Sequence, residues 1–201
     1  MNSLFSIDSP LWRFTDKVLR LIWLNLLWLL CSIPLITIGA STTALYSVTL
    51  KYVRDEEGYL TSSFFHAFKN NFRSSTIIWM LMSVFNVFLV IDLILYLRIQ
   101  STGALEFFML TIFFTALLIF LFVNLYIYAV IAYFQNTTIQ YIKNAFLLSI
   151  THWPVSILMI VSIFGIFLIG MLAFPPILFI SVSGFCYMGS KFFRHLFDQL
   201  A

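Results

Sequence analysis

Long apolar runs constrain this sequence more than any other feature. Residues 76–97 and 105–133 are each long enough to cross a bilayer as one helix, since a spanning helix takes about 20 residues. A further apolar stretch covers residues 154–188, and Pro175-Pro176 interrupts it because consecutive prolines remove helix donors. Charged residues make up only 9% of the chain, against about 25% in soluble domains. The chain is therefore predicted to be an all-α integral membrane protein surrounded by membrane lipid.

Three predicted hairpins make up a single transmembrane domain, residues 1–201. The first, residues 18–51, contains a proline and glycine break, and it either spans the membrane twice or forms a re-entrant hairpin. Residues 64–133 form an amphipathic connector followed by the second hairpin, and residues 138–190 form a connector followed by the third. A turn near residues 173–176 closes the third hairpin. The prediction is a polytopic helical bundle of about six membrane segments joined by short amphipathic cytoplasmic helices.

The distribution of lysine and arginine predicts the orientation. If the first hairpin returns to the side from which it entered, ten of the eleven basic residues lie on one side and only Arg98 lies on the other. Such an excess marks the cytoplasmic side of a membrane. Both termini are therefore expected in the cytoplasm, and the chain is expected to be a multi-pass protein of the cell membrane.

A short internal repeat relates the two connectors. Five residues recur with identical spacing 74 residues later, as Lys69/Lys143, Asn70/Asn144, Phe72/Phe146, Ser75/Ser149 and Trp79/Trp153. Both connectors are expected to be amphipathic helices at the membrane surface, which either anchor the protein or dock a partner. A chance match between the two short segments is the alternative to a true internal repeat. The candidate docking residues are Phe68, Lys69, Asn71, Phe72, Lys143, Asn144 and Phe146.

The sequence contains no familiar motif for catalysis, cofactor binding or metal binding. It has no glycine-rich phosphate loop, GxSxG elbow or HExxH pair, and His66, His152 and His195 lie far apart along the chain. Cys31 and Cys186 lie in apolar stretches, where they are expected to act as small hydrophobic side chains. The net charge of +3 is too small to indicate a nucleic-acid partner. The protein is not expected to be an enzyme or to carry a catalytic, cofactor or metal site.

The candidate functional polar residues inside the predicted spans are Asn86, Asp92 and Asn124. The two asparagines are expected to hydrogen-bond between helices. Asp92 lies six residues before Arg98. It therefore either forms a cap or ion pair near the outer surface or belongs to a proton or cation site in the membrane.

The first hairpin carries the most distinctive motif. Residues 32–40 read Ser-Ile-Pro-Leu-Ile-Thr-Ile-Gly-Ala, and Thr-Ala-Leu-Tyr follows at 43–46. Together with Phe65 and the segment 67–72, this pattern resembles the YesL-like family of bacterial integral membrane proteins over nearly the whole chain. The break at 34–39 is expected to be either a structural turn or part of a ligand site. The candidate functional residues of this hairpin are Asn25, Trp28, Pro34, Thr37, Gly39, Thr43 and Tyr46.

The resemblance implies an accessory role in carbohydrate uptake, because genes of this family commonly neighbour those for carbohydrate ABC importers. The expected function is an accessory or regulatory membrane subunit of oligosaccharide ABC import, with permease subunits as partners. A self-sufficient small-solute transporter or channel is the alternative, motivated by the intramembrane polar residues and the broken hairpin. A membrane enzyme acting on lipid or glycan is a third hypothesis, which no paired nucleophile and base supports.

Overall fold

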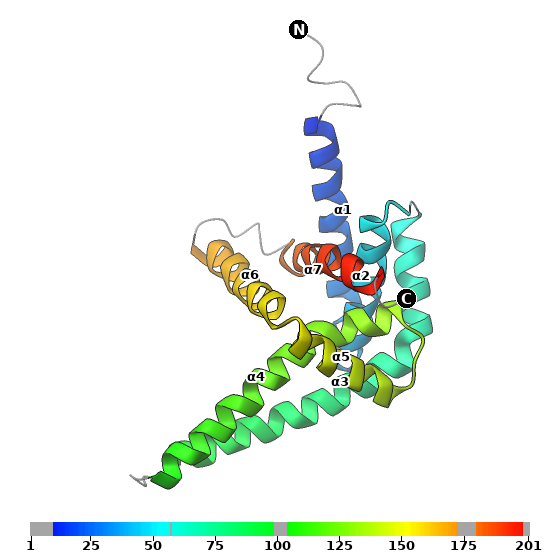
Figure 1. The fold of residues 1–201 in the computed structure, drawn as a ribbon. Helices are drawn as coiled ribbons and strands as arrows, with labels where there is room; N and C mark the ends of the chain where they lie inside the picture. The colour runs from blue at the N-terminus through cyan, green and yellow to red at the C-terminus, as the bar shows by residue number, and fades with distance from the viewer. Residues whose placement is uncertain (1–9, 57, 99–103, 173–179, 199–201) are drawn as a thin grey trace.

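The structure, a computed structural model, describes residues 10–56, 58–98, 104–172 and 180–198. Within these ranges the chain is built from helices and their connections (Figure 1). In chain order they are α1 (Pro10–Cys31), the 3-10 helix η1 (Leu35–Thr37), α2 (Ile38–Val53), α3 (Leu60–Arg98), α4 (Ala104–Tyr133), α5 (Thr138–Thr151), α6 (Trp153–Leu172) and α7 (Ser181–Asp198).

Helix α2 lies at the centre of the fold. It contacts α1, α3, α4 and α7, and its residues from Gly39 to Leu50 are almost all buried. Small residues such as Ala40 and Ala44, both fully buried, let the neighbouring helices approach closely. Aromatic side chains fill the space on the α7 side, where Tyr126 of α4 and Phe193 of α7 are fully buried with their ring centroids 5.1 Å apart.

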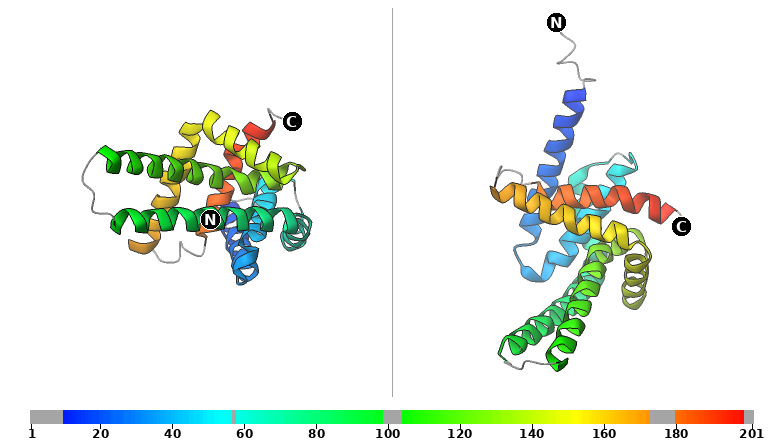
Figure 2. Two further views of the ribbon diagram at one scale, coloured as in Figure 1. Left: turned by 90° about the horizontal axis from the view of Figure 1, so that it is seen from below. Right: turned by 60° about the vertical axis from the view of Figure 1, so that its left-hand side comes forward.

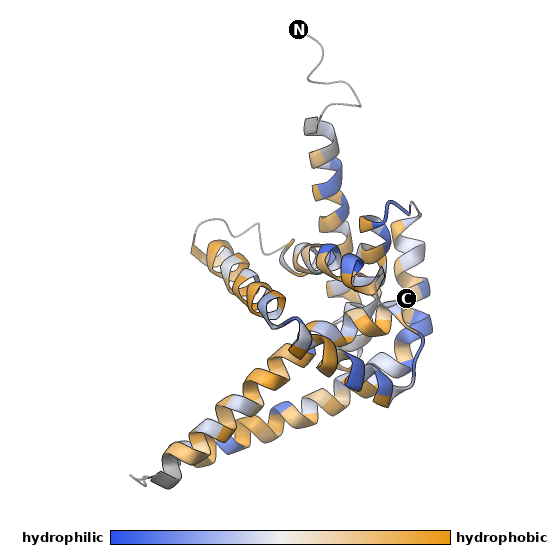
Figure 3. Ribbon diagram, in the orientation of Figure 1, coloured by the Kyte–Doolittle hydropathy of each residue, from blue (hydrophilic) through white to orange (hydrophobic). Residues whose placement is uncertain are grey.

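Three of the described helices have the length and composition of membrane spans. Their candidate spans are Leu60–Tyr96 in α3, Phe107–Tyr133 in α4 and Trp153–Leu172 in α6. The far halves of α3 and α4 run side by side, and α6 extends in another direction (Figures 1 and 2). Hydrophobic residues cover these segments, whereas hydrophilic residues gather on α1, the α2–α3 turn, the first half of α3 and α5 (Figure 3). Exposed apolar surface of this extent is typical of helices that face lipid.

The first connector is not a separate helix, contrary to the prediction for residues 64–73. It forms the start of α3, which runs unbroken for 39 residues, about 58 Å at 1.5 Å per residue. The second connector does form its own helix, α5, which ends at Thr151 before α6 begins. We attribute the break between α5 and α6 to Pro154, because a proline has no backbone N–H to donate to the preceding helical turn and disfavours a helical conformation in the residue before it. The position 74 residues earlier is Met80, which allows α3 to continue.

The described part of the last predicted membrane arm also differs from an apolar span. Residues 173–179, where the turn of the third hairpin was predicted, lie outside the described residues. From Ser181 the chain forms the amphipathic helix α7, which buries Ser183 and Phe197 and exposes Lys191 and Arg194. Neither α7 nor the α1–α2 hairpin belongs to the three candidate spans. The six-segment arrangement and the cytoplasmic placement of both termini therefore stay predictions.

Candidate functional site

Several hydrogen bonds within the chain pair polar groups at the break in the first hairpin. The hydroxyl of Thr37 donates to the carbonyl oxygens of Cys31 at 2.5 Å and Pro34 at 2.6 Å. The Cys31 carbonyl lies at the end of α1, where a helix leaves its last acceptors unpaired, and the Pro34 carbonyl lies just before η1. Trp28 donates from Nε1 to the hydroxyl of Thr42 at 3.1 Å, which ties α1 to α2. The break is thus built as a turn that supports itself.

Gly39 and Thr43 fit α2 against α3. A Cβ added to Gly39 would lie 2.6 Å from the Cβ of Trp79 and 2.7 Å from the carbonyl oxygen of Ser75. One turn further along, Ser75 donates to the hydroxyl of Thr43 at 2.9 Å, and both side chains are fully buried. Only glycine permits backbones to approach this closely, and the hydroxyl pair adds a polar tie between the helices.

The remaining hairpin candidates hold α7 in place. Asn25 is buried on α1, and its Oδ1 accepts from the backbone N–H of Ser183 at 3.2 Å. Tyr46 is buried on α2 with its ring centroid 6.0 Å from that of Phe193. None of the seven hairpin candidates lines any of the four cavities described below. Their contacts in the structure are contacts between helices.

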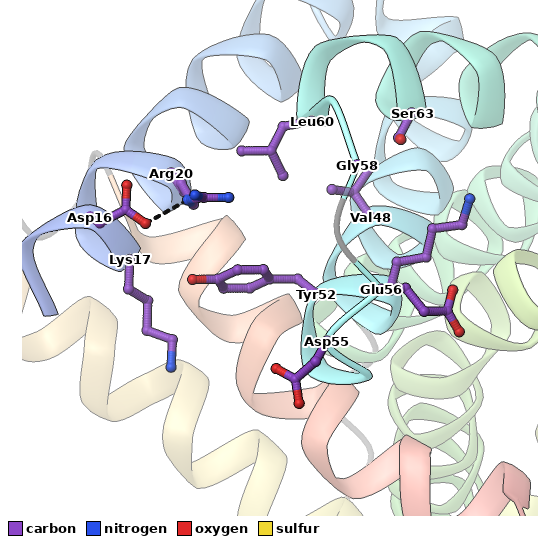
Figure 4. Close-up of a pocket in the computed structure, with 11 residues that line it drawn as sticks. Asp16, Lys17, Arg20, Val48, Tyr52, Asp55, Glu56, Gly58, Leu60 and Ser63 are labelled. Atoms are coloured by element: carbon purple, nitrogen blue, oxygen red, sulfur yellow. Dashed lines mark hydrogen bonds and ion pairs between the residues drawn. The ribbon is translucent and has the colours of Figure 1, made fainter. Parts of the chain in front are cut away.

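A charged cavity of about 430 Å³ lies between α1, the end of α2 and the start of α3 (Figure 4). The α2–α3 turn shapes one wall. There Asp55 has a φ of 58°, a left-handed conformation, and the backbone N–H groups of Asp55 and Glu56 donate back to Tyr52 and Lys51. This is a Schellman ending, a motif that usually places glycine at the left-handed position. The residues lining the cavity are Asp16, Lys17, Arg20, Val48, Lys51, Tyr52, Asp55, Glu56, Gly58, Leu60 and Ser63.

Tyrosine rings hold the basic side chains of this cavity. The Nζ of Lys17 lies 4.8 Å from the ring centroid of Tyr187 on α7 and 5.9 Å from that of Tyr52. The hydrogen bond to Tyr187 raises the pKa of Lys17, so this lysine stays charged at neutral pH. The guanidinium of Arg20 also lies over the Tyr52 ring, 5.9 Å from its centroid. Arg20 forms an ion pair with Asp16, with Nε and Oδ2 2.7 Å apart (Figure 4).

A second cavity of about 380 Å³ adjoins the first through Lys17, Tyr52 and Asp55. It adds Lys191 and Arg194 of α7, and Arg194 donates to the carbonyl oxygen of Val53 at 2.7 Å. This bond satisfies a carbonyl at the end of α2. Together, five basic and three acidic side chains line the two cavities. We call these eight residues the charged face. They are Lys17, Arg20, Lys51, Lys191 and Arg194, with Asp16, Asp55 and Glu56.

The two copies of the internal repeat have similar exposure but different surroundings. Phe72 is 39% exposed and Phe146 is 41% exposed, and both lysines three residues earlier are exposed. Asn71 and Asn144 are half-buried, as is Phe68. Lys143 and Phe146 also line an apolar groove between α3, α4 and α5. Lys69 and Phe72 line none of the four cavities.

The intramembrane polar candidates do not come together in one of these cavities. Asn86 is exposed and Asp92 is half-buried on α3. Asn124 donates to the carbonyl oxygen of Phe120 in its own helix at 2.9 Å, rather than to a neighbouring helix as predicted. None of the three lines a described cavity.

Two of the three histidines share a small cavity. His152 and His195 line a space of about 230 Å³ beside Lys191, and His66 is on α3 elsewhere. Among the residues that the structure describes, no group of three His, Cys, Asp or Glu side chains could hold a metal ion. Besides the two histidines, Lys191 is the basic residue that lines this cavity, and its other lining residues are aromatic or aliphatic.

Sequence reasoning did not identify the charged face. It used the basic residues of this face only to assign orientation. The contact of Lys17 with Tyr187 joins residues that are far apart in the sequence, and no local pattern indicates it. The available signal was the arrangement of charges at the end of α2, where Lys51, Asp55 and Glu56 lie close together in the chain.

Comparisons with known proteins agree with the resemblance in the first hairpin. Residues 21–93 match the family described as "Protein of unknown function, DUF624". The chain is 26% identical over 187 residues to "Uncharacterized protein YesL" of Bacillus subtilis (strain 168), covering 91% of this chain and 87% of that protein. It is 27% identical over 188 residues to "Uncharacterized protein YteU" of the same organism, covering 88% and 81%. No solved structure matches. The matched segment contains the second half of α1 and all of α2, and these matches support the resemblance to the YesL-like family.

Proposed function

We propose that this protein is an accessory or regulatory membrane subunit of a carbohydrate ABC importer, and that its charged face docks a permease subunit on the cytoplasmic side. The observation that carries the docking part is the convergence of five basic and three acidic side chains from α1, α2, the α2–α3 turn and α7. The carbohydrate part rests on the family resemblance and its gene neighbourhoods.

Several contacts support a binding role for the charged face. The ring centroids of Tyr52 and Tyr187 lie 5.7 Å apart, and the Nζ of Lys17 lies beside both, 5.9 Å from the first and 4.8 Å from the second. These two contacts hold the cation in position before a partner arrives. Mixed charge favours one orientation of a charged partner and disfavours others. Between Gly58 and Leu60, which both line the first cavity, Tyr59 is 88% exposed. A tyrosine with this exposure is a typical anchor at a protein interface.

The first connector extends this surface along α3. Lys69 and Phe72 lie within about three turns of Ser63, which lines the charged cavity. Both side chains are exposed. An exposed aromatic beside a lysine could also anchor in lipid headgroups, so a test has to separate protein contact from lipid contact.

A self-sufficient transporter is the alternative proposal. It needs a polar path between the spans, and its motivation was Asn86, Asp92 and Asn124 together with the broken first hairpin. Because these residues line none of the four cavities, the accessory role has more support from the contacts of the described residues. Purified protein that moves a sugar or an ion across liposomes without a partner would favour the transporter.

Photo-crosslinking in native membranes tests the docking surface. A photoreactive phenylalanine is placed at Tyr59, at Phe72 and, as a control, at Phe114, which is 59% exposed on the apolar α4. We expect adducts with an importer permease at positions 59 and 72 and lipid adducts at 114. Lipid adducts alone at all three positions would contradict the docking proposal.

A further inference from the structure

An apolar groove of about 600 Å³ lies between α3, α4 and α5. Its size falls within the range of about 300–1,000 Å³ that is common for small-ligand sites. Ten of its eleven lining residues are apolar, and Lys143 is the one charged residue among them. The groove is thus hydrophobic, with a single positively charged side chain.

The helices around the groove place that charge at one end. Phe85 of α3 and Ala116 of α4 lie in the candidate membrane spans. Lys143 belongs to α5, which is amphipathic and follows the end of α4. The groove therefore leads from a basic side chain into the part of the protein with the most hydrophobic surface, as Figure 3 shows for the far halves of α3 and α4.

Lys143 is available to an external anion. Its side chain is exposed, and it forms no ion pair with a described residue. No acidic residue lines the groove. A neutral occupant would leave this charge unmatched, whereas an anionic head group would complement it, and basic pockets between membrane helices are a common form of head-group site.

We infer that this groove binds one anionic phospholipid, with its acyl chains along Phe85 and Ala116 and its phosphate at Lys143. Phe146, 41% exposed at the same end, lies beside the head group, where aromatic rings are enriched. The site is separate from the charged face, since the two share no lining residue. It therefore does not depend on the proposed docking function.

The internal repeat supplies a matched control. Lys69 occupies the equivalent position 74 residues earlier and is also exposed, but it does not line the groove. Lys69→Ala and Lys143→Ala remove the same charge from the same motif. General attraction between a basic surface and anionic lipid predicts equal effects, whereas a built site predicts an effect at Lys143 only.

The test is native mass spectrometry of the purified full chain, titrated with phosphatidylglycerol or phosphatidylcholine of identical acyl chains. We expect one retained phosphatidylglycerol and weaker retention of phosphatidylcholine. Lys143→Ala should lower the affinity for phosphatidylglycerol about tenfold, the effect of losing one charged hydrogen-bond partner, and Lys69→Ala should leave it unchanged. Lys143→Arg should retain the preference.

A second variant tests the groove itself. Ala116→Phe fills it and should reduce retention of both lipids, while its thermal midpoint in detergent reports whether the fold is intact. Equal losses for Lys69→Ala and Lys143→Ala would overturn the inference, as would unchanged binding in a folded Ala116→Phe protein. A bound second copy of the chain in place of lipid would also overturn it.

Discussion

Gly39 and Trp79 are in contact so close that a Cβ on the glycine would lie 2.6 Å from the Cβ of the tryptophan. The clash would involve the base of a large side chain and the carbonyl of Ser75, neither of which can move without shifting α3. We therefore predict that Gly39→Ala lowers the free energy of unfolding by about 1–3 kcal/mol, the usual cost of overpacking. Thermal unfolding in detergent measures it.

Gly165 on α6 is the matched control, because a Cβ there meets nothing within 4 Å. Gly165→Ala should leave the thermal midpoint unchanged or raise it, since alanine favours a helix over glycine by roughly 0.5–1 kcal/mol. Equal midpoints for Gly39→Ala and the natural protein would contradict the close packing of α2 on α3.

The hydroxyl pair of Thr43 and Ser75 is predicted to couple these helices. Both side chains are fully buried, with oxygens 2.9 Å apart. Ser75→Ala should lower the free energy of unfolding by about 0.6–1.7 kcal/mol, the range for hydrogen bonds between membrane helices. A double-mutant cycle with Thr43→Val should give a coupling of similar size. Ser83, which donates only to Trp79 of its own helix, should show no coupling with Thr43.

Asp55 is expected to store backbone strain at the charged cavity. Its φ of 58° places it in the left-handed region, which costs residues other than glycine roughly 1–2 kcal/mol and aspartate somewhat less. Asp55→Gly should therefore raise the thermal midpoint, and Asp55→Ala should lower it. A lower midpoint for Asp55→Gly than for Asp55→Ala would show that the carboxylate contributes more to stability than the conformation costs.

The tip of the first hairpin is predicted to lie in lipid. Ile33 is 72% exposed, Leu35 is 70% exposed and Ile36 is 57% exposed, and a tip facing water would favour polar residues. In a protein whose two native cysteines are replaced, Ile36→Cys should resist a membrane-impermeant maleimide from either side. Tyr59→Cys should react from the cytoplasmic side and serves as the positive control. Labelling of position 36 from outside would instead indicate two full spans.

Local features of the sequence predicted the parts of the fold that depend on length and composition. The runs at 76–97 and 105–133 fall within α3 and α4, and the proline–glycine break separates α1 from α2. Pro154 does separate α5 from α6, but Met80 in the other copy of the repeat allows one long helix. The difference agrees with the physical effect of proline, which lacks the N–H that a continuous helix needs at that position.

Long-range contacts explain what the sequence did not predict. The apolar composition before residue 190 indicated a membrane arm, yet Ser183 and Ser190 lie at helical spacing and bond to α1 and α2. This pattern identifies α7 as an amphipathic helix packed on its neighbours. The charged face was missed because Lys17 and Tyr187 meet only once α7 is in place. The hairpin candidates were found by resemblance, and their described contacts are between helices.

Affinity purification from native membranes tests the docking proposal most directly. Tagged protein is recovered in a mild detergent beside a Lys17→Glu, Arg20→Glu variant and a Lys143→Glu control, each checked by its thermal midpoint. The account predicts stoichiometric recovery of carbohydrate importer permease subunits with the natural protein and the control, and their loss with the double variant. Recovery of the natural protein alone, without a permease subunit, would contradict it.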